Sequence, residues 1–169
     1  MQSVKDLILK SMLHEYMILE HLHSRIPESS MEWRPQENMR STRELLQYLS
    51  YIGSTITELM IKGGWSVPEN VEKYRANAAA SKTMAPETFL EKIHSEKAKV
   101  TELIEKLSEA DLDREIGLIL GRKGSLGQAL INDTIKYLTA YRMQLFLYAK
   151  MNGAEIGTAN NWNGIDRKS

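Results

Sequence analysis

The longest uninterrupted helical pattern in the chain runs from about Ser125 to Met151 and contains no proline. Apolar residues recur along it every three or four positions, and such residues share one face because an α-helix turns by about 100° per residue. One row on this helix carries a carboxylate and two phenols beside its apolar end, namely Asp133, Tyr137, Tyr141 and Leu145. An apolar face that also carries polar groups is where we expect a functional site.

Three further amphipathic segments precede this stretch. The spacing of their apolar residues predicts helices over about 3–25, 40–62 and 86–107. Capping-box patterns mark two helix starts, at Ser41-x-x-Glu44 and Ser125-x-x-Gln128. Four amphipathic helices, most of about 20 residues or more, predict an all-α four-helix bundle.

The connections between these helices differ in character. Residues 65–85 contain Pro68 and a run rich in Asn, Ala and Ser, which predicts a long polar connection between the second and third helices. The glycine-rich segment 108–124 is predicted to be a loop with room for a short extended piece. We expect the bundle to occupy residues 1–153 and an irregular tail to occupy residues 154–169.

The composition argues against several classes of function. The 169 residues include 22 Lys and Arg and 22 Asp and Glu, so the net charge is zero, and we expect no nucleic-acid or membrane partner. The chain has no cysteine, which excludes disulfides and thiolate metal sites and is typical of the reducing cytoplasm, where we expect the protein. No run of about 18 apolar residues predicts a membrane-spanning helix.

Several short motifs resemble the DinB-like (DinB/YfiT) superfamily. They are Trp33-Arg34-Pro35, Ser41-Thr42-Arg43-Glu44-Leu45-Leu46-Gln47-Tyr48-Leu49 and Tyr141-Arg142-Met143-Gln144. The resemblance covers about Leu7 to Gly153, and it implies a four-helix bundle with a long connection after the second helix. It also implies that the partner is a second copy of the chain, because members are often homodimers. Many members hold a divalent metal with three histidines, and some use it for thiol transfer to small molecules or for their isomerisation.

The three histidine positions of the family fall on Tyr48, Tyr137 and Tyr141 of this sequence. A neutral imidazole binds a metal without ionising, whereas a phenol must lose a proton, which costs roughly 4 kcal/mol at neutral pH. Three phenol ligands would cost about 12 kcal/mol, comparable to the whole apparent binding free energy of a structural zinc site. We therefore expect a tyrosine-lined pocket, supported by Asp133 and Gln144, with no metal and no cofactor.

The three tyrosines leave two interpretations open beside a metal site: ordinary core residues with paired hydroxyls, or the walls of a pocket for a small-molecule ligand. The function hypothesis is a cytoplasmic, dimeric DinB-like protein that binds a small molecule or is non-catalytic. The alternative is a DinB-type transferase without a metal or with an unusual one, in which Tyr141 or Tyr137 donates a hydrogen bond and Asp133 acts as base. A third possibility is an assembly module. Whether the chain is an enzyme stays open.

Two Glu-x-x-His pairs, Glu20/His23 and Glu91/His94, match a motif of ferritin-like di-iron sites. The helical rotation places Glu91 opposite the apolar stripe of its helix and the first pair at the edge of its own stripe. Surface positions are the better interpretation of both pairs.

Other polar groups are also predicted to lie at the surface. His14, Glu15 and His21 form a small group on the first helix, and Gly121-Arg122-Lys123-Gly124-Ser125 lacks the ending and the preceding strand of a phosphate-binding loop. Lys136 and Arg142 lie off the face predicted to be buried, so we expect them to be solvent-exposed or at a dimer edge.

Overall fold

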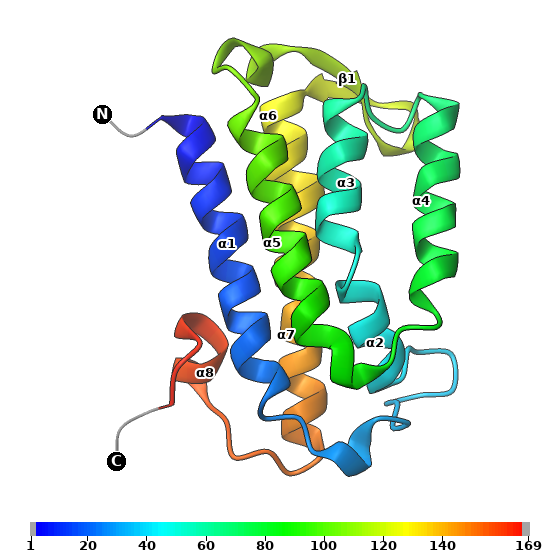
Figure 1. Cartoon of the computed structure of the whole chain (residues 1–169), viewed down its shortest axis with the longest axis vertical. Coiled ribbons are helices and arrows are strands. Elements are labelled where there is room, and N and C mark those ends of the chain that lie inside the picture. The colour runs from blue at the N-terminus through cyan, green and yellow to red at the C-terminus, as the bar shows by residue number, and fades with distance from the viewer. Residues whose placement is uncertain (1–2, 167–169) are drawn as a thin grey trace.

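Amphipathic helices must bury their apolar stripes against one another, and the computed structural model, which describes residues 3–166, is a helical bundle (Figure 1). The helices are α1 (Val4–His23), α2 (Thr42–Leu49), α3 (Ile52–Ile61), α4 (Pro68–Ser81), α5 (Phe89–Glu105), α6 (Leu126–Ala129), α7 (Lys136–Met151) and α8 (Thr158–Asn163). A π-helical turn, η5 (Leu130–Ile135), joins α6 to α7. The 3-10 turns are η1 (Glu28–Ser30), η2 (Pro86–Thr88), η3 (Ala110–Asp113) and η4 (Ile119–Gly121).

Four helical segments enclose the core. They are α1, the α2–α3 pair, α5 and the continuous segment α6–η5–α7. Helix α1 packs against α5 and α7, and α3 packs against α5. The side chains at the centre are fully buried, among them Met12, Leu19, Leu45, Phe89 and Leu130. The predicted all-α four-helix bundle is confirmed.

The second segment consists of two helices, whereas the sequence predicted a single helix over residues 40–62. Helix α2 ends at Leu49 and α3 begins at Ile52. The backbone amide of Ser54, in the first turn of α3, donates to the Glu96 carboxylate at 2.8 Å, and the Ser54 hydroxyl donates to the same group. A buried acceptor from α5 therefore satisfies an amide that an unbroken helix would bond internally. Because Glu96 is 42 residues away, the break has no local signal.

The predicted polar connection 65–85 is wrong in its main part, because residues 68–81 form α4. Pro68 occupies the first turn, where its missing N–H is harmless. Only Asn70 of α4 is buried, so the helix has no apolar stripe for a sequence pattern to detect. The Asn70 side-chain amide instead lies 3.0–3.3 Å from the carbonyls of Leu59, Lys62 and Gly64, and it fixes α4 to the end of α3. Helix α4 stands at the edge of the bundle (Figure 1).

The glycine-rich segment contains the short extended piece that was expected. Strand β1 (Glu115–Gly117) pairs antiparallel with β2 (Lys123–Ser125), and Glu115 lies opposite Ser125. Gly64 adds a single bridge to Gly117. Gly64 has a φ of +85°, and a Cβ there would lie 1.8 Å from the Gly117 carbonyl oxygen, so only glycine fits.

The prediction that Arg142 is solvent-exposed is wrong, since its exposed fraction is 0%. Leu138, Arg142 and Leu145 are spaced four and three apart, so they share the face of α7 that packs on α1. The Arg142 Nε donates to Glu15 Oε2 at 2.6 Å, and Nη1 donates to the Asn161 carbonyl at 2.6 Å. Glu15, expected at the surface, is buried as well. Lys136 is exposed, as predicted.

The tail predicted to be irregular from residue 154 contains α8, which packs against α1. The Asn160 side chain bridges His21 and Asp166, and Arg25 pairs with Asp166. Residues 167–169 of the predicted tail lie outside the described residues. Within residues 3–166, every helix is too short or too polar to span a lipid bilayer.

Candidate functional site

The three tyrosines predicted to line a pocket, Tyr48, Tyr137 and Tyr141, lie together in the structure. Tyr48 comes from α2, and Tyr137 and Tyr141 come from successive turns of α7. The ring centroids of Tyr48 and Tyr141 are 4.5 Å apart, and those of Tyr137 and Tyr141 are 6.3 Å apart with nearly parallel planes. Tyr141 is thus the middle ring of the three.

Three more rings extend this group. Tyr51 lies 5.7 Å from Tyr48, Tyr74 lies 6.4 Å from Tyr51, and Trp65 lies 5.3 Å from Tyr74, all between centroids. We call the resulting set the aromatic cluster, and its members are Tyr48, Tyr51, Trp65, Tyr74, Tyr137 and Tyr141. The sequence analysis missed Tyr74 and Trp65 because both fell in the predicted connection, where no helix face could be assigned. Tyr51 lies at the helix break, which the sequence did not show.

A cation already lies on this cluster. The guanidinium carbon of Arg40 is 4.3 Å from the ring centroid of Tyr48 and 5.5 Å from that of Tyr141. Both distances are within the range of a cation–π interaction. The Arg40 carbonyl accepts a hydrogen bond from the Tyr148 hydroxyl at 3.0 Å, and Gln144 donates to that hydroxyl at 2.6 Å. Gln144, predicted to support the pocket directly, therefore bonds to Tyr148 and acts on the cluster through the backbone of Arg40.

Burial favours the neutral form of two phenols of the cluster, Tyr48 and Tyr51. It raises the pKa of Tyr48 well above the ordinary value of 10.0, and the nearby Tyr141 and Tyr74 phenols raise it further. Burial and Tyr74 also raise the pKa of Tyr51. Neutral phenols can donate hydrogen bonds, but they are poor ligands for a metal.

Asp133 lies at the Tyr137 end of the cluster. Burial raises the pKa of the Asp133 carboxyl, and the positive charges of Arg122 and Lys136 partly offset that rise. Burial raises the pKa of Tyr137 first, and the charge of Asp133 raises it further. A carboxyl group with a raised pKa is able to exchange a proton closer to neutral pH than an exposed one.

The open space at this site lies beside the three tyrosines. A hollow of about 720 Å³ is lined by Tyr48, Tyr51 and Tyr74, by Arg40, and by polar residues of α4 and of the segment before α2. Tyr137 and Tyr141 do not line it. Their rings pack together with Tyr48, so the volume available to a ligand is on the α4 side of Tyr48 and Tyr51.

The residues present do not fit a divalent metal. The part of the chain that the structure describes contains no group of three or more His, Cys, Asp and Glu side chains close enough to hold one ion. Burial raises the pKa of Tyr48 and Tyr137, which favours their neutral phenols, and the Arg40 guanidinium puts a positive charge against Tyr48. A second cation at this position would be repelled.

The histidines elsewhere have structural partners. Glu20 Oε1 lies 2.9 Å from Lys97 Nζ and 3.2 Å from His94 Nε2, which forms an ion-pair group between α1 and α5. The ring of His23 stacks on Phe89 at 5.0 Å. This agrees with the interpretation that the Glu-x-x-His pairs are not a di-iron site.

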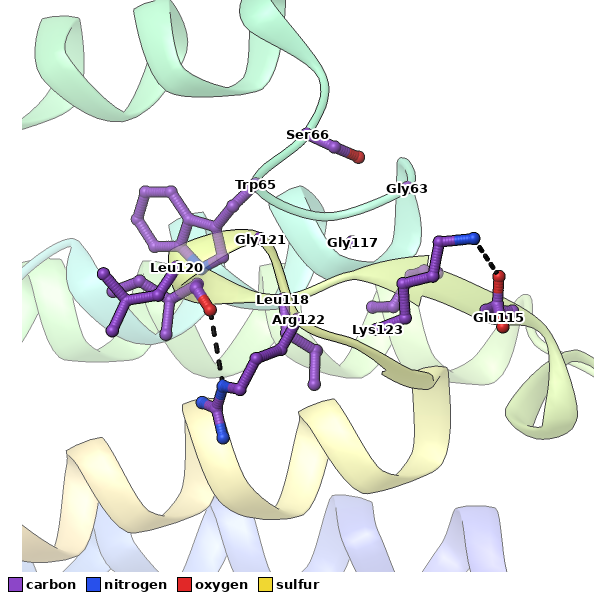
Figure 2. A pocket seen from close by; sticks show the side chains of 12 residues that line it. Gly63, Trp65, Ser66, Glu115, Gly117, Leu118, Leu120, Gly121, Arg122 and Lys123 are labelled. Atoms are coloured by element: carbon purple, nitrogen blue, oxygen red, sulfur yellow. Dashed lines mark hydrogen bonds and ion pairs between the residues drawn. The ribbon is translucent and has the colours of Figure 1, made fainter.

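A second hollow, of about 480 Å³, lies at the β1–β2 hairpin (Figure 2). Gly63, Trp65 and residues 115–123 line it, and Lys123 Nζ lies 2.8 Å from Glu115 Oε1. The Arg122 side chain donates to the Ile119 carbonyl at 3.5 Å, and Gly121, Arg122 and Lys123 are solvent-exposed. The motif 121–125 is thus an exposed hairpin strand and turn with no phosphate cradle.

Two crystal structures are similar to this fold. A DinB-like protein from Bacillus subtilis has a TM-score of 0.67 at 20% sequence identity, over 89% of this chain and 95% of that chain. A candidate member of the DinB family from Exiguobacterium sibiricum has a TM-score of 0.70 at 15% identity, over 95% of this chain and 99% of that chain. No family model and no curated protein matches the sequence. The predicted DinB-like fold is therefore confirmed.

Proposed function

We propose that this chain is a DinB-like protein that binds a small molecule without a metal, and that Tyr48, Tyr137 and Tyr141 replace the metal ligands of that superfamily. The observation that carries the proposal is the position of Arg40, whose guanidinium lies 4.3 Å from the Tyr48 ring centroid. This side chain supplies a fixed positive charge where other members hold a divalent cation.

Ionisation argues in the same direction. Ionising a phenol with an ordinary pKa costs roughly 4 kcal/mol of free energy at neutral pH. Because burial raises the pKa of Tyr48 and Tyr137, the penalty at these two positions is larger than that. No gain from metal binding at a site that also faces Arg40 offsets three such penalties.

Elemental analysis of purified protein tests the absence of a bound metal. We expect substoichiometric zinc, nickel, iron and manganese in the unmodified chain. A triple variant with Tyr48→His, Tyr137→His and Tyr141→His should gain affinity for Zn²⁺, because imidazoles bind without ionising. The matched control is the triple phenylalanine variant, which removes the hydroxyls and adds no ligand. One stoichiometric metal in the unmodified chain, lost in the phenylalanine variant, would contradict the proposal.

Dimerisation and location are part of the same proposal. The resemblance to the DinB-like superfamily, whose members are often homodimers, supports a homodimer, and the lack of cysteine supports a cytoplasmic location. Light scattering on the eluting protein measures whether the mass is that of one chain or two. A single-chain mass at high protein concentration would remove the dimer from the proposal and leave the ligand site unaffected.

A second candidate function is a transferase of the DinB type that works without a metal. The observation that favours it is the raised pKa of Asp133 beside Tyr137. In this scheme Asp133 takes a proton from the attacking group of a substrate while Tyr137 or Tyr141 donates a hydrogen bond. The measurement is the rate of thiol transfer to an acceptor substrate. A rate that is lost in Asp133→Asn and kept in Glu91→Gln would support this function. Equal turnover in both variants would exclude the role of Asp133.

A further inference from the structure

We infer that the 720 Å³ hollow beside Tyr48 binds a small organic anion with a flat body, and that Arg40 holds its carboxylate or phosphate group. This inference deepens the proposed function and rests on it, since it names the class of molecule that a site without a metal would take.

The charges around the hollow leave two cations for a ligand. Arg43 Nε pairs with Glu32 Oε1 at 2.6 Å, and Arg34 Nη2 pairs with Glu44 Oε2 at 3.3 Å. Within each pair, the positive and the negative charge neutralise each other. Arg40 and Lys82 also line the hollow, and neither side chain has an ion pair or a hydrogen bond with any residue between 3 and 166. The wall also contains one acidic side chain, Glu37, that forms no ion pair within residues 3–166.

The chemistry of Arg40 suits an oxyanion. A guanidinium carries five N–H donors in a planar fork, which match the two oxygens of a carboxylate or phosphate. In Arg40 the Tyr48 ring lies over one face of the group, while the N–H donors have no acceptor in the described part of the chain. The cation–π contact restrains the side chain before a ligand arrives, so less conformational entropy is lost on binding.

The rest of the wall suits a flat, partly apolar body. Tyr51 and Tyr74, whose ring centroids lie 6.4 Å apart, both present aromatic surface to the hollow, and Ala78 adds a small apolar patch. The raised pKa of Tyr48 and Tyr51 keeps these hydroxyls protonated, so they donate to an anion instead of repelling it. At the hairpin hollow both cations already have a partner, because Lys123 is paired with Glu115 and the Arg122 side chain donates to the Ile119 carbonyl.

The test is isothermal titration calorimetry of the full chain, in buffer containing EDTA, with four probes. Phenyl phosphate and benzoate carry both the ring and the anion, inorganic phosphate carries the anion alone, and benzylamine carries the ring with a positive charge. We expect saturable binding of phenyl phosphate or benzoate, binding at least tenfold weaker for inorganic phosphate, and none for benzylamine.

Variants locate the site. Arg40→Gln should weaken the binding of phenyl phosphate by about tenfold or more, because a charge-assisted bidentate contact is lost. Arg40→Lys keeps the charge and loses the fork, so we expect an intermediate loss. The matched control is Arg75→Gln, an exposed arginine of α4 outside the lining of the hollow, which should change the affinity by less than about threefold. Thermal melting of each variant confirms that it is folded.

Several outcomes would overturn the inference. They are the absence of saturable binding of both aromatic anions up to about 10 mM, unchanged affinity in a folded Arg40→Gln, or benzylamine binding as tightly as benzoate. These failures are distinct from a failure of the proposed function. Bound metal in the elemental analysis would contradict the metal-free site, whereas the titrations in EDTA report on Arg40 alone.

Discussion

The buried pair between Glu15 and Arg142 gives the sharpest test of how this bundle is held together. In Arg142→Met the long side chain is kept, but the Glu15 carboxylate, whose side chain is 10% exposed, loses its counter-charge. Removing one partner of a buried pair costs about 3–5 kcal/mol, because the other charge stays buried and uncompensated. The variant also loses the hydrogen bonds from Arg142 to Asn161, which hold α8 against the body.

A double variant separates the charge from the packing. In Glu15→Leu with Arg142→Met no unpaired charge remains, and apolar replacements of a buried pair are often neutral or stabilising. The native pair is itself incompletely satisfied, since the Arg142 Nη2 has no partner within residues 3–166. We therefore expect the double variant to be more stable than Arg142→Met, by roughly 2 kcal/mol or more.

Urea unfolding at neutral pH with linear extrapolation measures these free energies of unfolding. The control is Lys106→Met, which breaks the exposed pair between Lys106 and Glu102. The side chains of Lys106 and Glu102 are 69% and 66% exposed, respectively. Such a pair contributes less than about 1 kcal/mol. Our account of Arg142 would be refuted if Arg142→Met lowered the free energy of unfolding by less than about 1 kcal/mol. It would also be refuted if the destabilisation of the double variant equalled the sum of the destabilisations of the two single variants.

Three further predictions concern single side chains. Burial raises the pKa of Glu96 above its ordinary value of 4.5, so the folded state keeps this proton to higher pH than the unfolded chain does. The free energy of unfolding should then fall as pH rises from about 4.5 towards the folded pKa, and Glu96→Gln should flatten this part of the urea–pH profile. Asn70→Ala should cost about 1–3 kcal/mol and speed hydrogen exchange in α4, whereas Asn77→Ala, with one bond to Thr55, should cost less. Tyr137→Phe should change the free energy of unfolding by less than about 0.5 kcal/mol, since its hydroxyl bonds to no residue that the structure describes.

The sequence was sufficient for features that depend on local periodicity. The row of Tyr137 and Tyr141 follows from the 3.6-residue repeat of one long helix, and Tyr48 follows from the stripe of the second. The rings from the two helices meet because their apolar faces must bury each other. The capping box at Ser41 and the N-cap at Ser125 mark the starts of α2 and α6 for the same local reason.

The features that escaped prediction depend on partners distant in sequence. Arg142 was assigned to the surface because it lies off the helix face predicted to be buried, and its partner Glu15 lies 127 residues away. The break between α2 and α3 depends on Glu96. Helix α4 lacks an apolar stripe and is anchored by Asn70, so a pattern of hydrophobic residues could not reveal it or the place of Tyr74.

Adjacent residues of the Tyr141-Arg142 motif lie on different faces of α7, about 100° apart, and this separates stability from binding. Tyr141 faces α2 and lies in the aromatic cluster, whereas Arg142 faces α1 and pairs with Glu15. A change at Arg142 should therefore lower the free energy of unfolding while leaving the affinity of the folded protein for phenyl phosphate within about threefold of the original. Arg40→Gln should do the reverse, because its side chain is exposed and its contacts are with the rings and the hollow. If both variants weakened binding equally, the two faces of α7 would be coupled, and the hollow could not be treated as a site independent of the core.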